Sequence, residues 1–237
     1  MRKYNKESFA KLIDHTGLDS NQDDTYMDKL CQEAKEYHFK MVAINSVQTA
    51  YCKKLLEGTD VHVGAAVSFP LGQTTIETKV FETKDAIGNG ADEIDYVINI
   101  SEVKNKNWDY IKDEMTQIVR VCQEHKVISK VIFENCYLDR DEIIEVAKIA
   151  TEVKPDFIKT STGKATGGAT AEDVKLMKET VGDVVKVKAS GGIRSFEDVH
   201  KMLQAGAERI GCSQSIKIME QFEEYLKANN LEELVIE

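Results

Sequence analysis

The chain has 237 residues, of which 42% are hydrophobic and 30% charged, and its formal net charge is −10. This length and composition suit one folded domain with a buried core and exclude a largely disordered chain. The acidic balance argues against a nucleic-acid-binding surface, which usually carries a basic excess, and no apolar run is long enough to span a membrane. No apolar segment follows the basic residues near the start, so we expect a cytoplasmic enzyme without a secretory signal.

Eight short apolar runs follow one another along the chain and predict strands. They cover residues 12–13, 41–44, 61–69, 93–98, 128–133, 156–158, 184–187 and 208–210. Their average spacing is about 28 residues, the length of a strand, a helix and two loops. Helical patterns lie between them, as in residues 27–34 and 108–122, where apolar side chains recur on one face. Thr170 and Ser195 are expected helix N-caps, and Gly90 and Gly206 lie where helices should end.

Eight strand–helix alternations predict a (β/α)8 TIM barrel formed by a single domain over residues 1–237. A short N-terminal helical extension and a C-terminal helix should flank it. The alternative is a doubly wound open sheet, which normally carries a glycine-rich dinucleotide turn after an early strand, and residues 13–17 do not supply one. The apolar residues from Ile216 onward fit either the barrel bottom or the interface of a homodimer.

Cysteines and histidines give no sign of a disulfide or metal framework. The 5 cysteines are odd in number and include no Cys-x-x-Cys pair, and the 5 histidines form no His-x-x-x-His cluster. We therefore expect reduced cysteines, and chemistry without a metal ion or cofactor.

Polar residues gather where the strands should end. In chain order they are Asp14, Asn45, Ser68, Asp95, Glu134, Lys159, Lys188 and Ser213. Barrel interiors are normally filled by Val, Ile and Leu, so this density at one face predicts a functional site. Strand alternation places Glu93, Asp95 and Val97 on one face, and an inward acid needs a cationic partner.

Lys159 and Lys188 each follow a β-branched run and precede small residues, which places them at the ends of adjacent buried strands. A buried ammonium is costly and tends to lose its proton, and a neutral lysine amine attacks carbonyl carbon. A structural salt bridge is the alternative for either lysine alone. Two lysines beside inward acids favour one neutral amine, with the other ammonium and the carboxylates moving protons.

Glycine-rich loops follow the seventh and eighth predicted strands, at residues 191–194 and 211–213. These loops often form a phosphate site in a TIM barrel, because glycine lets backbone amides approach an anion. A bare Gly-Gly pair more often forms a simple turn, but its position between Lys188 and a predicted helix start favours the anion site.

Taken together, these residues resemble the deoxyribose-phosphate aldolase family. The matching stretches run in family order across most of the chain: residues 13–16, 69–72, 90–95, 130–132, 159–163, 167–170, 188–194 and 209–211. The motifs Lys-Thr-Ser-Thr-Gly from Lys159 and Lys-Ala-Ser-Gly-Gly from Lys188 are the most specific of them.

The resemblance implies a class I aldolase, a carbon–carbon lyase of deoxyribose phosphate catabolism. Such an enzyme reversibly cleaves 2-deoxy-D-ribose 5-phosphate to D-glyceraldehyde 3-phosphate and acetaldehyde. The resemblance assigns the Schiff base to Lys159, proton transfer to Asp95 and Lys188, and a place in the acid–base network to Asp14. The phosphate contacts that it implies are Gly163, Lys164, Gly191, Gly192 and Ser213.

Several positions depart from the family pattern, among them Gly17, Ala43, Ser68, Asn135 and Gln214. They leave the lysines and acids intact, so we expect them to affect rate and substrate range rather than reaction type. Two alternatives stay open: another phosphosugar aldolase or isomerase of the barrel class, and a catalytically silent phosphosugar-binding protein.

Overall fold

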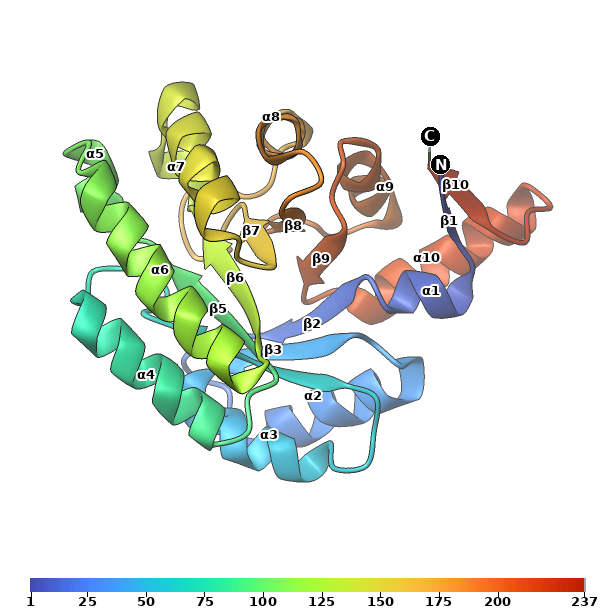
Figure 1. Cartoon of the computed structure of the whole chain (residues 1–237). Coiled ribbons are helices and arrows are strands. Elements are labelled where there is room, and N and C mark those ends of the chain that lie inside the picture. The colour runs from blue at the N-terminus through green and yellow to red at the C-terminus, as the bar shows by residue number, and fades with distance from the viewer. Residues whose placement is uncertain (237) are drawn as a thin grey trace.

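A closed barrel of eight parallel strands forms the centre of the protein (Figure 1). The computed structural model describes residues 1–236. The barrel strands are β2 (Ile13–Gly17), β3 (Met41–Asn45), β4 (His62–Val67), β5 (Glu93–Val97), β6 (Ile128–Ile132), β7 (Phe157–Lys159), β8 (Lys186–Ser190) and β9 (Arg209–Cys212). They pair in chain order, and β9 closes the barrel by pairing with β2. The TIM-barrel prediction is confirmed, and the open doubly wound sheet is wrong.

Helices surround the barrel on its outside (Figure 1). They are α2 (Asp24–Tyr37), α3 (Thr49–Leu55), α4 (Ile76–Gly88), α5 (Ile100–Lys104), α6 (Trp108–His125), α7 (Arg140–Val153), α8 (Ala171–Val181), α9 (Phe196–Gln204) and α10 (Ser215–Ala228), with short 3₁₀ helices η1 (Ser46–Gln48) and η2 (Asn135–Tyr137). Thr170 and Ser195 cap α8 and α9, as predicted, by accepting hydrogen bonds from backbone amides three residues later. Gly90 and Gly206 follow the ends of α4 and α9 in left-handed backbone, with φ of 100° and 111°.

Strand alternation divides the barrel residues between two environments. The outward side chains, such as Val42, Ile94 and Val187, are fully buried in the apolar layer against the helices. The inward positions are different, because several of them carry charged side chains rather than the aliphatic residues usual in a TIM barrel. Asp95 and Lys188 are examples, and both are buried. The fold therefore encloses a polar interior that must balance its own charges.

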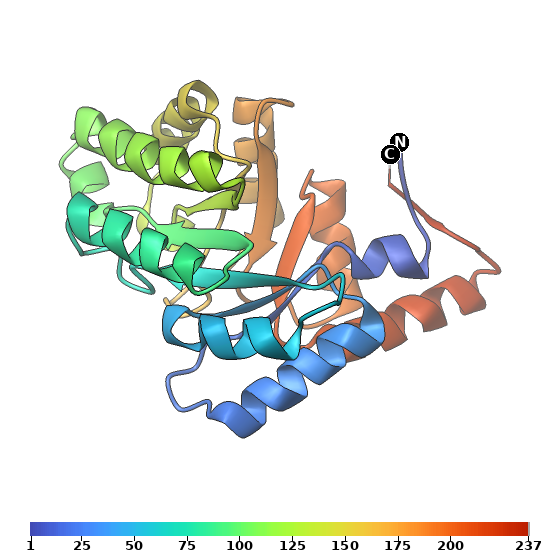
Figure 2. The ribbon, with the colours of Figure 1, turned by 60° about the horizontal axis from the view of Figure 1, so that its bottom comes forward.

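The two ends of the described chain pair with each other away from the barrel mouth. Strand β1 (Arg2–Tyr4) lies antiparallel to β10 (Leu234–Ile236), and α1 (Lys6–Ala10) follows β1. Figure 2 shows β1 and β10 side by side next to α1 and α10. Phe9 of α1 stacks on Phe222 of α10 with ring centroids 3.9 Å apart. The N-terminal extension thus contains a strand besides the expected helix, and the C-terminal segment continues past its helix into a strand.

Among residues 1–236, no helix has both the length and the apolar character that crossing a membrane requires.

Candidate active site

Asp95 of β5 is the centre of a buried ion-pair network inside the barrel. Its Oδ2 atom accepts from Lys159 Nζ at 2.8 Å and from Lys188 Nζ at 2.7 Å, and its Oδ1 accepts from Lys130 Nζ at 2.6 Å. All four side chains are at least 95% buried. The predicted inward acid therefore has three cationic partners, supplied by strands β6, β7 and β8.

Asp14 of β2 joins the same network from the other side. Its Oδ2 lies 2.5 Å from Lys188 Nζ, and its Oδ1 accepts from Arg209 Nη1 at 2.7 Å. Lys188 thus lies between two carboxylates, Asp14 and Asp95. The structure brings together all four residues that the resemblance placed in catalysis, at the carboxyl side of the barrel interior.

The network also contains Lys130 and Arg209, which the sequence does not predict as functional residues, and Glu93, which it predicts only to share a strand face with Asp95. Lys130 Nζ bridges Asp95 and Glu93 Oε2, both at 2.6 Å, and Arg209 Nη1 lies 3.3 Å from Glu93 Oε2. Strand pairing offers a signal for the first of them, because Lys130 is the register partner of Asp95. A lysine aligned with an inward acid on the neighbouring strand is itself inward and available to pair.

Burial and neighbouring charges shift these groups in different directions. Burial lowers the pKa of Lys159 to about 8; Asp95 opposes this shift and Lys188 adds to it. Burial would raise the pKa of Asp95, but the ammoniums of Lys130, Lys159 and Lys188 outweigh it and hold that pKa well below its usual range. Burial would also lower the pKa of Lys130, but Asp95 and Glu93 raise it instead. The barrel interior therefore favours the neutral amine at Lys159 and the ammonium at Lys130.

Charge counting in the network leads to the same lysine. Three carboxylates, Asp14, Glu93 and Asp95, contact four cationic side chains, Lys130, Lys159, Lys188 and Arg209. An excess buried positive charge is unfavourable and is relieved by deprotonation. Lys159 has a single carboxylate contact, whereas Lys130 and Lys188 each have two. Loss of its proton balances the network at the smallest cost in ion pairs.

Lys159 also lines a cavity of about 260 Å³ at the carboxyl ends of the strands. The same cavity is lined by the five predicted phosphate contacts, Gly163, Lys164, Gly191, Gly192 and Ser213. Gly163, Gly191 and Gly192 all have positive φ, between 77° and 84°. This geometry favours glycine, and it leaves the loops without side chains that would fill the cavity. The glycine loops and Lys159 thus share one small polar pocket.

Two basic side chains, Lys164 and Arg194, line this cavity. The Lys164 ammonium pairs with Asp19, which also lines the cavity, so a bound anion would compete with that carboxylate. Arg194 lines the cavity as well and was not among the predicted contacts. Its place directly after the Gly191-Gly192 loop is the signal that could have added it.

Two other polar residues at strand ends have structural partners. Glu134 accepts from the backbone N–H of Thr162 at 3.0 Å and from the Thr162 hydroxyl, so it holds the loop after β7. The hydroxyl of Ser68 pairs with Thr74 at 2.7 Å, and its backbone N–H donates to Glu82. Glu134 thereby fixes Thr162, which lines the cavity, whereas Ser68 holds the loop that follows β4.

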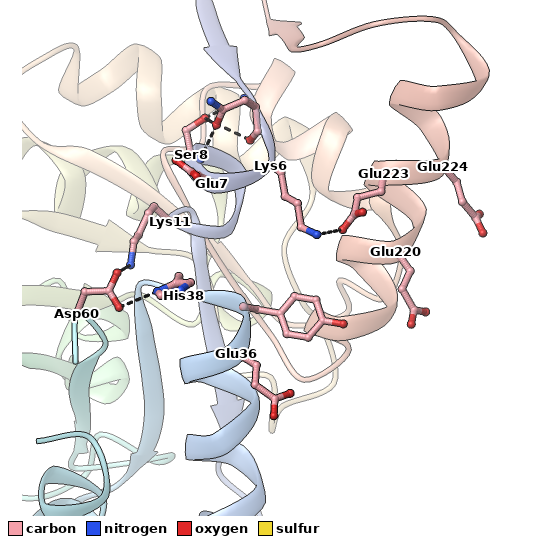
Figure 3. A pocket seen from close by; sticks show the side chains of 12 residues that line it. Lys6, Glu7, Ser8, Lys11, Glu36, His38, Asp60, Glu220, Glu223 and Glu224 are labelled. Carbon is pink, nitrogen blue, oxygen red and sulfur yellow. Dashed lines mark hydrogen bonds and ion pairs between the residues drawn. The ribbon is translucent and has the colours of Figure 1, made fainter. Parts of the chain in front are cut away.

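A larger hollow, of about 1140 Å³, lies at the opposite end of the molecule between α1, the end of α2 and α10 (Figure 3). Half of its lining residues are acidic and most are exposed, with surface ion pairs such as Lys6–Glu223 at 2.7 Å and Lys11–Asp60 at 2.6 Å (Figure 3). Such exposed pairs are screened by solvent and contribute little to stability, and none of the predicted site residues lines this hollow. Size alone therefore does not locate the chemistry in this fold.

In residues 1–236, no group of three or more His, Cys, Asp and Glu side chains is arranged to hold a metal ion. The groups that could hold a ligand at the candidate site are hydrogen-bond donors: side-chain ammonium, guanidinium and hydroxyl groups, and backbone amides. Such donors suit an anionic ligand.

Comparison with known proteins places the site in a family context. Residues 8–213 match the family described as DeoC/LacD family aldolase. The chain is 58% identical to the deoxyribose-phosphate aldolase of Lactobacillus acidophilus over 234 residues, which cover 99% of both chains. It is 48% identical to the deoxyribose-phosphate aldolase of Clostridium perfringens, over 91% of this chain and 96% of that one.

The structural comparison agrees with the sequence comparison. The tetrameric deoxyribose phosphate aldolase from Aeropyrum pernix superimposes with a TM-score of 0.86 at 30% identity, over 93% of each chain.

Proposed function

The chain belongs to the DeoC/LacD aldolase family and is an aldolase acting on deoxyribose phosphate, and we propose that Lys159 forms the Schiff base of its reaction. One observation carries this assignment. Lys159 is the buried lysine whose pKa falls to about 8, and it lines the cavity formed by the glycine loops. A lysine amine that is neutral in part near pH 7 can add to an aldehyde carbon.

The first half of the reaction joins the sugar to the enzyme. The neutral amine of Lys159 adds to the aldehyde carbon C1 of open-chain 2-deoxy-D-ribose 5-phosphate and forms a carbinolamine. Loss of the C1 hydroxyl as water, with one proton supplied to it, gives an iminium ion. Asp95 Oδ2 lies 2.8 Å from Lys159 Nζ and 2.7 Å from Lys188 Nζ. Protons can therefore pass between the two lysines and Asp95 through short hydrogen bonds.

The second half of the reaction breaks the C2–C3 bond and releases the two products. A base removes the proton of the 3-hydroxyl, the C2–C3 bond breaks, and its electron pair moves toward the iminium nitrogen. D-Glyceraldehyde 3-phosphate leaves, and the acetaldehyde carbons remain on Lys159 as an enamine. Protonation of C2 and hydrolysis of the resulting iminium release acetaldehyde and restore the amine. Asp14, which contacts Lys188, completes the proton network.

The glycine loops orient the substrate at a distance from the reacting bond. Backbone amides of Gly163, Gly191 and Gly192, the Lys164 ammonium and the Ser213 hydroxyl would bind the 5-phosphate. Binding energy gained there holds C1 of the substrate against Lys159. This positioning lowers the entropic part of the activation free energy.

Trapping with acetaldehyde and borohydride tests the assignment. Reduction of the iminium should replace one amine hydrogen of the protein by an ethyl group, and peptide mapping should place that group on Lys159. A Lys159→Ala variant should take up no such mass at the site. Modification of Lys188 instead, with Lys159 unmodified, would reverse the assignment of the two lysines.

For its cellular setting, we propose a cytoplasmic, single-domain enzyme of deoxyribose phosphate catabolism that assembles as a homodimer. The exposed apolar residues Leu231 and Val235 near the C-terminus support an interface there. Sedimentation at several concentrations tests the assembly.

A further inference from the structure

His15 lies next to Asp14 in the chain but faces the opposite side of strand β2. Strand alternation directs Asp14 into the barrel and His15 toward the helices. The imidazole is 3% exposed, and both ring nitrogens have partners. Nδ1 lies 2.8 Å from Ser215 Oγ of α10, and Nε2 lies 2.8 Å from Glu33 Oε2 of α2. His15 therefore connects one barrel strand to two helices.

The partners determine how the ring is protonated. Burial lowers the pKa of His15, although Glu33 opposes that shift, so the ring is neutral at pH 7. An ionised carboxylate only accepts hydrogen bonds, so the ring proton lies on Nε2 and is donated to Glu33. Nδ1 is then an acceptor, and the Ser215 hydroxyl donates to it. This contact is shorter than the 3.2 Å between Ser215 Oγ and the Cys212 carbonyl.

A serine, a histidine and a carboxylate in this order also form the triad of serine hydrolases. Here the hydroxyl cannot serve as a nucleophile, because Ser215 is fully buried. No substrate carbonyl can reach Ser215 Oγ without unfolding the start of α10. The hydrogen bonds from Glu33 through His15 to Ser215 therefore have a structural role.

The loop held by this contact carries part of the phosphate site. Ser215 begins α10, and Ser213, two residues earlier, lines the cavity that contains Lys159. Ser213 is exposed, so its own packing does not fix it. On the other side of the loop, Cys212 is the register partner of His15 in the β2–β9 ladder. The loop from Cys212 to Ser215 is thus attached to His15 at both ends.

We propose that His15 is a positioning residue that holds the β9–α10 loop, through the Ser215 hydroxyl, in the geometry with which Ser213 and the neighbouring backbone bind the substrate's phosphate group. This inference rests on the proposed function. It assigns a role to the second residue of the Asp14-His15 pair, which the reaction itself does not use.

The test compares a phosphorylated and an unphosphorylated substrate. We measure kcat and KM of wild type, His15→Leu and Ser215→Ala on 2-deoxy-D-ribose 5-phosphate and on 2-deoxy-D-ribose. Losing one buried hydrogen bond should raise KM for the phosphorylated sugar by about five- to tenfold, with kcat within about twofold. The efficiency on deoxyribose should stay within about twofold, because that substrate has no phosphate. The inhibition constant of inorganic phosphate should rise by the same factor as KM.

Two variants separate positioning from general damage. His15→Asn places an amide oxygen near the position of Nδ1, so the Ser215 contact persists and KM should return toward the wild-type value. Ser129→Ala removes another buried hydroxyl, which contacts Asp156 at 3.1 Å away from the β9–α10 loop, and should leave KM unchanged. If His15→Leu does not fold, Ser215→Ala gives the same comparison with the imidazole in place.

Equal losses on both sugars, or unchanged KM and phosphate inhibition in Ser215→Ala, would overturn the positioning role. Absence of any cleavage by the wild-type enzyme would instead contradict the proposed function. The two failures are therefore distinguishable.

Discussion

Lys159 and Lys188 contact the same oxygen atom, Oδ2 of Asp95, at 2.8 and 2.7 Å. Two ammonium ions on one carboxylate oxygen repel each other strongly when buried. Burial is the largest cause of the lowered pKa of Lys159, and Lys188 is a further one. The shared oxygen places the Lys188 ammonium beside Lys159, where its charge adds to the lowering of the Lys159 pKa.

The reactivity of Lys159 should follow its own titration. Iminium formation with acetaldehyde, trapped by cyanoborohydride, should rise with pH through a midpoint at about 8, because only the neutral amine adds to the aldehyde. About a tenth of the lysine is neutral one unit below that midpoint. A trapping rate that keeps rising to the pH range of an ordinary lysine would show that the barrel does not lower this pKa.

Asp95→Asn should move that midpoint downward. The Asp95 carboxylate raises the pKa of Lys159 and so opposes the lowering by burial. A neutral asparagine removes this effect, so the free amine of Lys159 should form at lower pH. Turnover should nevertheless fall by about a hundredfold or more, since a proton carrier is lost. Asp92→Asn, just before the same strand, is the matched control and should leave both quantities unchanged. An upward or absent midpoint shift in Asp95→Asn would contradict the electrostatic account.

Lys188→Met should move the midpoint in the opposite direction. Lys188 lowers the pKa of Lys159, so its removal leaves Asp95 free to stabilise the Lys159 ammonium. We expect trapping at pH 7 to slow and turnover to fall by about a hundredfold. Lys186→Met changes an exposed lysine on the same strand and serves as control. If both Lys188→Met and Asp95→Asn shifted the midpoint the same way, the shared-oxygen interpretation would be wrong.

Gly191→Ala should weaken phosphate binding specifically. Gly191 has φ of 84°, and a Cβ there would lie 3.1 Å from Gly168 Cα and 3.3 Å from Gly163 Cα. The loop must shift to admit it, at a cost of about 1–2 kcal/mol for the backbone alone. KM for deoxyribose 5-phosphate should rise about tenfold, whereas efficiency on unphosphorylated deoxyribose should change little. A similar loss on both sugars would indicate damage beyond the phosphate site.

The sequence allowed the barrel to be predicted because each strand is a short apolar run at a regular spacing, and the inward face of β5 followed from alternation alone. Lys159, Lys188, Asp95 and Asp14 lie together as expected. Their shared position follows from closure of the barrel, which brings the ends of β2, β5, β7 and β8 to one interior.

The remaining partners depend on register and side-chain reach, which no local pattern specifies. Lys130 reaches two carboxylates only because β5 and β6 pair in one register. Lys164 meets Asp19 from a loop 145 residues away in the chain. The pairing of β1 with β10 is likewise a contact between the two ends of the chain. Such contacts arise from tertiary packing, so they become visible only in the folded structure.

Lys159 is the residue proposed here as the nucleophile, and its removal tests that role most directly. Cleavage of 2-deoxy-D-ribose 5-phosphate should be measured for wild type, Lys159→Ala and the surface control Lys148→Ala, after circular dichroism has shown that each variant folds. We expect activity in wild type and Lys148→Ala, and a loss of at least about a thousandfold in Lys159→Ala. Cleavage by folded Lys159→Ala at a rate near that of wild type would contradict that role.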